Sequence, residues 1–243
     1  GFYDLFPGTV AEESLPSDRS FVARYGSVNM VFVNVHNIRF NASGRAEAID
    51  EFFVPEQIAK YKDFIMEMDT LMTGIHEIGH VMGGTILKTE EEVYFGKNYH
   101  LIDEEKPELI SMWALPILKE KGIITEEQEI AGYYAMLLTI ITSMNREPND
   151  HMGARNMMFH YFLRHRSIVE YQADNGKSTK FGIDPVKMRI CVRDMLGHVV
   201  DIISEGNLEE LARFKGEYLS GARKEEFNAR LSNLPSGAGL IFP

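Results

Sequence analysis

The stretch that decides the fold is residues 55–84, PEQIAKYKDFIMEMDTLMTGIHEIGHVMGG. Its apolar side chains recur at steps of three and four residues, as Ile58, Tyr61, Ile65, Met68, Met72, Ile75 and Met82. Such steps place side chains along one face of an α-helix. Pro55 suits the first helical position, and Gly83 and Gly84 suit the position after the last turn. The pattern therefore predicts a helix over residues 55–82 with one apolar face.

This helix carries the pattern His76-Glu77-Ile78-Gly79-His80. Residues four apart on a helix point the same way, so the two imidazoles can occupy adjacent corners of a Zn²⁺ tetrahedron. Glu77 is turned about 100° from His76 around the helix axis, so it can hold and deprotonate a water molecule without binding the metal. The alternative is a pair of ordinary surface histidines. The position beside the apolar face favours a zinc site with His76 and His80 as ligands.

Such a site needs a third ligand. A histidine six residues after His80 is one solution, but Ile86 occupies that position. The other solution is a glutamate on a later helix, followed one turn on by an acid that orients a ligating histidine. In the helix expected over 103–121, only Glu104 has an acidic partner four residues on, Glu108. We therefore expect Glu104 to bind the metal and Glu108 to orient a histidine.

The neighbouring acids of this segment receive a different interpretation. Asp103 has Pro107 four residues on, and Glu105 has Leu109. Both acids are expected to be solvated at a helix start, where the helix dipole favours negative charge. Pro107 would then lie in the first turn, where proline is tolerated.

The rest of the chain is mostly helical by pattern. Further helices are indicated from the capping box Thr125-Glu-Glu-Gln128 to about 145, over 149–165, and from Asp184-Pro185 to about 206, with one or two more at the end. Alternation predicts one or two strands over 27–38, and a hairpin over 168–183 around Asp174-Asn175-Gly176. We expect an irregular arm over 1–27, then a single, mostly α domain over 28–243 with these small β elements.

Composition excludes several classes of protein. The 243 residues include 25 basic and 36 acidic side chains, a net charge of −11, so no basic footprint for nucleic acid is visible. The one cysteine, Cys191, cannot form an internal disulfide. No apolar run of about 18 residues is present to cross a membrane, and no leader pattern is visible. A cytoplasmic protein without a nucleic-acid or membrane partner is expected.

The two metal-site motifs resemble those of the dipeptidyl-peptidase III family of zinc peptidases, which pairs an HExxH-like motif with an EExxxE/D motif on a following helix. The counterparts here are His76-Glu-Ile-Gly-His80 and Asp103-Glu-Glu-Lys-Pro-Glu108. Aligning the last acid on Glu108 puts the family's zinc-binding glutamate on Glu104. The resemblance implies a helical zinc-metallopeptidase lobe and runs, in patches, over roughly residues 28–205.

A third segment, Asp150-His-Met-Gly-Ala-Arg155, is also similar to the family. There a histidine lies near the zinc and helps to stabilise the tetrahedral intermediate, and an arginine one turn later faces the substrate cleft. The resemblance assigns these roles to His151 and Arg155. Together with Glu77 as the catalytic base, this implies hydrolysis of short peptides.

The chain also departs from the family. Most members insert one residue between the two ligating histidines, whereas this chain has the five-residue form. Family members carry a second lobe ahead of the metal lobe, but only 75 residues precede His76 here. The chain is therefore expected to be either the metal lobe of a two-lobed protein, without the preceding lobe, or a reduced relative of the family. Two alternatives to a dipeptidyl-peptidase III-like enzyme stay open: a zinc- or peptide-binding lobe without turnover, and a zinc endopeptidase with the same ligands.

Overall fold

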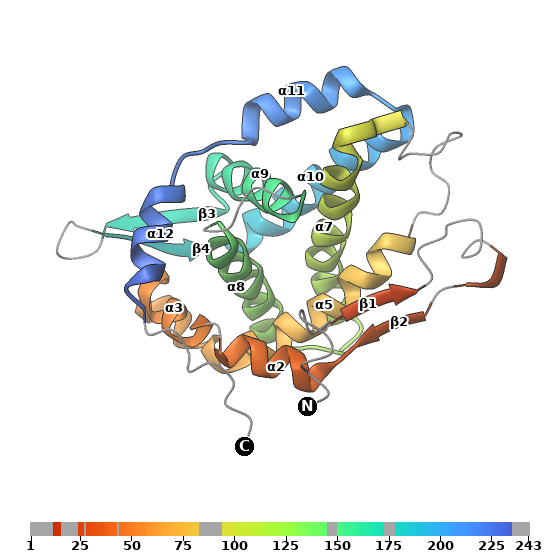
Figure 1. Cartoon of the computed structure of the whole chain (residues 1–243). Coiled ribbons are helices and arrows are strands. Elements are labelled where there is room, and N and C mark those ends of the chain that lie inside the picture. Colours follow the sequence, from red (N-terminus) through yellow and green to blue (C-terminus); the bar gives the residue numbers. More distant parts are fainter. Residues whose placement is uncertain are drawn as a thin grey trace, which may run out of the picture.

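The computed structural model describes residues 12–15, 24–26, 28–42, 44–82, 94–144, 150–172 and 178–234. Figure 1 shows helices packed around a central helix, with two small β-ribbons at the periphery. Both ribbons are antiparallel pairs: β1 (Glu12–Leu15) with β2 (Val28–Val31), and β3 (Ile168–Gln172) with β4 (Thr179–Ile183). The mostly α fold with small β elements is thus confirmed. Among the described residues, no helix is long and apolar enough to cross a membrane.

The central helix is α8 (Glu126–Ser143), which is buried along almost its whole length. It begins at the predicted capping box, where Thr125 and Gln128 exchange side-chain to backbone hydrogen bonds. Helices α5 (Ile65–Val81), α7 (Tyr99–Glu120) and α9 (Asp150–Arg164) pack around it. Because α5, α7 and α9 also surround one pocket, this packing positions the functional side chains described below.

The C-terminal part follows the predicted order of elements. Helix α10 (Pro185–Glu205) begins at the N-cap Asp184, whose side chain accepts a hydrogen bond from the Lys187 amide, and ends at Gly206 in the left-handed conformation. Helices α11 (Leu208–Tyr218) and α12 (Lys224–Ser232) complete the described chain. The predicted hairpin is confirmed as β3 and β4, and the turn predicted at 174–176 lies outside the described residues.

The helix predicted over 55–82 is broken in its first third. Its parts are α4 (Pro55–Ile58), the short 3₁₀ helix η2 (Lys62–Phe64) and α5. The break lies where the Tyr61 ring stacks on Tyr134 of α8, with ring centroids 5.7 Å apart, while Ile58 is buried in the core. The helix is interrupted where these two side chains pack into the core, at a point that helical periodicity alone does not reveal.

The N-terminal expectations also need correction. Part of the arm expected to be irregular over 1–27 forms strand β1, whose backbone pairs with β2. Only the first part of the strand segment predicted over 27–38 is extended, because α2 (Val33–Ala42) follows β2 directly. Helix α2 packs on α5, and α3 (Arg45–Phe52) packs on α8. Tertiary contacts therefore override the alternating pattern of the segment.

Candidate active site

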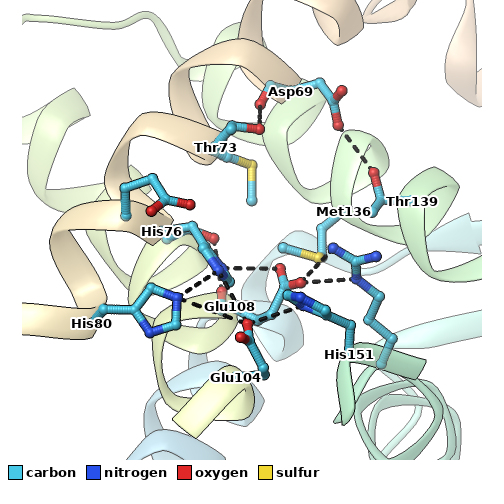
Figure 2. Close-up of a pocket in the computed structure, with 13 residues that line it drawn as sticks. Asp69, Thr73, His76, His80, Glu104, Glu108, Met136, Thr139 and His151 are labelled. Atoms are coloured by element: carbon cyan, nitrogen blue, oxygen red, sulfur yellow. Dashed lines mark hydrogen bonds and ion pairs between the residues drawn. The ribbon is translucent and has the colours of Figure 1, made fainter. Parts of the chain in front are cut away.

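The two histidines and the glutamate predicted as metal ligands meet in one cluster. His76 Nε2 lies 3.2 Å from His80 Nε2 and 3.3 Å from Glu104 Oε2, and His80 Nε2 lies 3.8 Å from the same oxygen. Figure 2 shows the two rings turned toward this carboxylate, which reaches in from α7. Ligand atoms at the corners of a zinc tetrahedron are about 3.3 Å apart for bonds of about 2.0 Å. The cluster is therefore close to the spacing that zinc requires.

The chemistry of the cluster fits a divalent cation. Glu104 Oε2 is buried and accepts no well-formed hydrogen bond from the described residues, although His151 Nδ1 lies 2.9 Å away. Two imidazoles and one carboxylate are a common zinc donor set that leaves a position open for water or substrate. His76, His80 and Glu104 could thus hold a metal ion together.

Burial and charge act against each other at these ligands. Burial opposes ionisation of Glu104, but His151 and His76 outweigh it and hold the pKa of this carboxyl well below its usual range. Burial would lower the pKa of His76, but the carboxylates of Glu104 and Glu108 raise it. Burial and the neighbouring His76 lower the pKa of His80. The surroundings therefore favour an ionised Glu104 and positive charge between the carboxylates.

Each of the two histidines has a second carboxylate near its other ring nitrogen. Glu108 Oε2 lies 3.8 Å from His76 Nδ1, and Asp103 Oδ2 lies 3.8 Å from His80 Nδ1. Glu108, predicted to orient a histidine, lies near His76, and Asp103, expected to be solvated, lies near His80. Spacing along one helix face points to an acid one turn after Glu104 and gives no sign of the acid directly before it. That neighbour is turned about 100° around the helix and faces the second histidine instead of the first.

Glu105 was likewise expected to be solvated and is buried instead. Helix α7 begins at Tyr99, four residues earlier than predicted, and it packs on α5, α9 and α10. Residue 105 therefore lies within an enclosed helix, not at an exposed helix start, and Pro107 lies beyond the first turn. Neither carboxyl oxygen of Glu105 has a hydrogen-bond partner among the described residues, and burial raises its pKa well above the usual value.

The remaining predicted residues line one pocket with the cluster. Glu77 is 8% exposed, and the side chain of His151 is 42% exposed. Arg155 also lines the pocket, but its side chain donates a hydrogen bond to Glu108 Oε1. The pocket has a volume of about 340 Å³. Its walls are formed by Asp69, Met72, Thr73, His76, Glu77, His80, Glu104, Glu108, Ser111, Met136, Thr139, His151 and Arg155.

The pocket wall also includes part of a polar network that the sequence did not reveal. Asp69 is on the same face of α5 as His76, two turns earlier, and its Oδ2 atom lies 2.8 Å from His36 Nε2 and 2.6 Å from Arg45 Nη1. Its Oδ1 atom accepts a hydrogen bond from Thr139 at 3.0 Å (Figure 2). The network joins α2, α3, α5 and α8, and so it fixes the start of the helix that carries the histidines.

The fold and the site together define a helical lobe with a His-His-Glu cluster in a pocket. Models of known protein families do not match this chain, and no curated protein matches it. Solved structures match in fold. The structure of DPP III from Caldithrix abyssi gives a TM-score of 0.77 at 21% identity over 94% of this chain. The structure of dipeptidyl-peptidase III from Corallococcus sp. strain EGB gives 0.77 at 17% identity, also over 94%.

The chain thus has a dipeptidyl-peptidase III-like fold. At these identities the likeness establishes the fold alone. The chain spans 43% and 42% of the length of those two proteins, so it corresponds to less than half of each.

Proposed function

We propose that this chain is the catalytic lobe of a zinc-dependent peptidase that hydrolyses short peptides, as dipeptidyl-peptidase III does. The observation that carries the proposal is the cluster of His76, His80 and Glu104 beside Glu77 in one pocket. The dipeptidyl-peptidase III-like fold supports it independently. We take residues 28–243 as one functional unit. We also propose a cytoplasmic location, because the single cysteine gives no sign of an oxidising compartment.

His76, His80 and Glu104 would hold the zinc ion. Zinc at such a site acts as a Lewis acid and lowers the pKa of a bound water molecule to about 7. Glu77, enclosed in the same pocket, accepts the proton of the attacking water and passes it to the amine that leaves. His151, which is more exposed and lies on α9, stabilises the oxygen that gains negative charge. Asp103 and Glu108 orient the two ligating histidines.

The first experiment measures bound zinc and peptide cleavage on the same protein. We expect about one zinc per chain, and cleavage of short peptides with a free amino end. The variant Glu77→Gln should keep the zinc and lose about 10²- to 10⁴-fold in rate, because proton transfer typically contributes that much. Glu67→Gln, an exposed position on the same helix, should leave both unchanged.

Each other outcome has a definite meaning. Cleavage of amino-blocked peptides would identify an endopeptidase with the same ligands. Zinc binding without cleavage of any peptide would identify a binding lobe without turnover. Wild-type rates in the Glu77→Gln variant would exclude the mechanism, and a protein that binds no zinc would exclude the metal site.

A further inference from the structure

We propose that Arg155 is a positioning residue of the metal site, which acts through Glu108 on His76, and not a contact for the substrate. This inference rests on the proposed zinc site. It differs from the role that the family resemblance implied, in which this arginine faces the peptide.

The contacts of Glu108 carry the inference. Arg155 Nε donates to Glu108 Oε1 at 2.8 Å, and Arg155 Nη2 lies 2.6 Å from the same oxygen. The other carboxylate oxygen, Oε2, is the one that lies 3.8 Å from His76 Nδ1. The arginine thus takes one oxygen of the carboxylate with two donors and leaves the other oxygen for the histidine. This division fixes the rotation of the carboxylate.

Burial explains why Glu108 depends on this partner. Its side chain is 4% exposed, and that of Arg155 is 19% exposed. A carboxylate removed from water needs a paired charge and hydrogen bonds to stay in one orientation. The planar guanidinium supplies both in a fixed geometry, which the flexible ammonium of lysine does not. Removing the arginine would leave the buried carboxylate without this charge and free to turn from His76.

The spacing of the two helices matches this role. His151 and Arg155 are four residues apart on α9, and Glu104 and Glu108 are four residues apart on α7. Residues four apart share a helix face, and α7 packs against α9. His151 lies at Glu104 and Arg155 at Glu108, so each of these two basic groups of α9 lies against one carboxylate of α7. Helix α9 therefore positions both carboxylates, that of the proposed ligand and that of its neighbour.

Zinc affinity, measured by competition with a chelator of known affinity, tests this inference without any peptidase assay. We expect Arg155→Met to weaken zinc binding about 10- to 100-fold, the usual cost of losing a residue that orients a metal ligand. Arg155→Lys should recover part of the loss, because it restores the charge without the two-donor geometry. Arg189→Met is the matched control, since Arg189 also pairs with a buried glutamate, Glu129, away from the pocket. It should leave zinc affinity unchanged.

A double-mutant cycle with Glu108→Gln tests whether Arg155 affects zinc binding through Glu108. If Arg155 acts through Glu108, the double variant should bind zinc about as weakly as Glu108→Gln alone. Wild-type zinc affinity in Arg155→Met with a raised KM for peptides would overturn the inference in favour of substrate binding. Losses that multiply in the double variant would also overturn it. If the wild type binds no zinc, the proposed function itself fails. Circular dichroism identifies any variant that does not fold.

Discussion

Gly79 lies against Pro107 so closely that a Cβ atom on the glycine would fall 2.8 Å from both Cα and Cβ of the proline. Gly79 stands between His76 and His80 on α5, and Pro107 lies between Glu104 and Glu108 on α7. A tight contact between these two helices thus lies beside the His-His-Glu cluster. The distance between the two histidines and Glu104 therefore depends on a residue without a side chain.

Gly79→Ala should therefore weaken zinc binding and destabilise the fold. Overpacking costs about 1–3 kcal/mol, and the contact is with backbone, which cannot move aside as a flexible side chain does. This cost opposes a gain of about 1 kcal/mol from replacing a helical glycine. Zinc titration and urea unfolding would measure both effects. Gly74→Ala on the same helix is the control, because among the described residues its Cβ would meet only Val31 Cγ2, at 3.6 Å, and it should be neutral or stabilising.

Asp103→Asn should weaken zinc binding about 10-fold, because the carboxylate that faces His80 Nδ1 would lose its charge. Chelator competition measures the change. Asp201→Asn, at an exposed position of α10, should leave zinc affinity unchanged. Equal affinity in the Asp103 variant and the wild type would show that Asp103 has no part in orienting His80.

Asp69→Asn should lower the free energy of unfolding by about 1–3 kcal/mol, because Arg45 and His36 would lose a charged acceptor. Arg45 is partly exposed, so solvent screening keeps the loss toward the lower end. Burial opposes ionisation of Asp69, but Arg45 and His36 hold its pKa below the usual 3.8.

The contribution of Asp69 to stability is full above pH 3.8 and is lost as the pH falls through the folded pKa. Urea unfolding at several pH values should therefore show the difference between wild type and variant shrinking in acid. Asp63→Asn, at an exposed position of η2, is the control and should be neutral. A difference that grows toward acid would contradict this account of the network.

Glu105→Leu should stabilise the protein at pH 7 by about 1–3 kcal/mol, because it removes a buried carboxyl without a hydrogen-bond partner among the described residues. Burial raises the pKa of Glu105 well above 4.5, so the folded protein binds this proton more tightly than the unfolded chain. The contribution of Glu105 to the free energy of unfolding is complete below pH 4.5. It is lost as the pH rises through the pKa that Glu105 has in the folded protein.

The advantage of the Glu105→Leu variant should therefore increase from acid to neutral pH. Glu105→Gln also cannot ionise, so its unfolding free energy should vary less steeply with pH than that of the wild type. Unfolding curves at matched pH values test both. If all three proteins showed the same pH dependence, the pKa of Glu105 would not differ between the folded and unfolded states.

Local signals predicted those parts of the fold that depend on a few adjacent residues. The structure confirms three such predictions: the capping box at Thr125, the N-cap at Asp184 and the hairpin strands around 168–183. The break before α5 and the helical course of α2 could not be read in this way. Both are set by contacts with helices far away in the sequence, such as that of Tyr61 with Tyr134.

For the candidate site, the sequence by itself predicted His76, Glu77, His80 and the pair Glu104 and Glu108, because helical spacing fixes how side chains are placed around one helix. Only the tertiary structure decided which basic group meets each carboxylate: Arg155 at Glu108, His151 at Glu104 and His80 at Asp103. It also decided that Glu105 is buried. The physical reason is that burial and pairing of charge depend on the distance between helices, which periodicity within one helix does not contain.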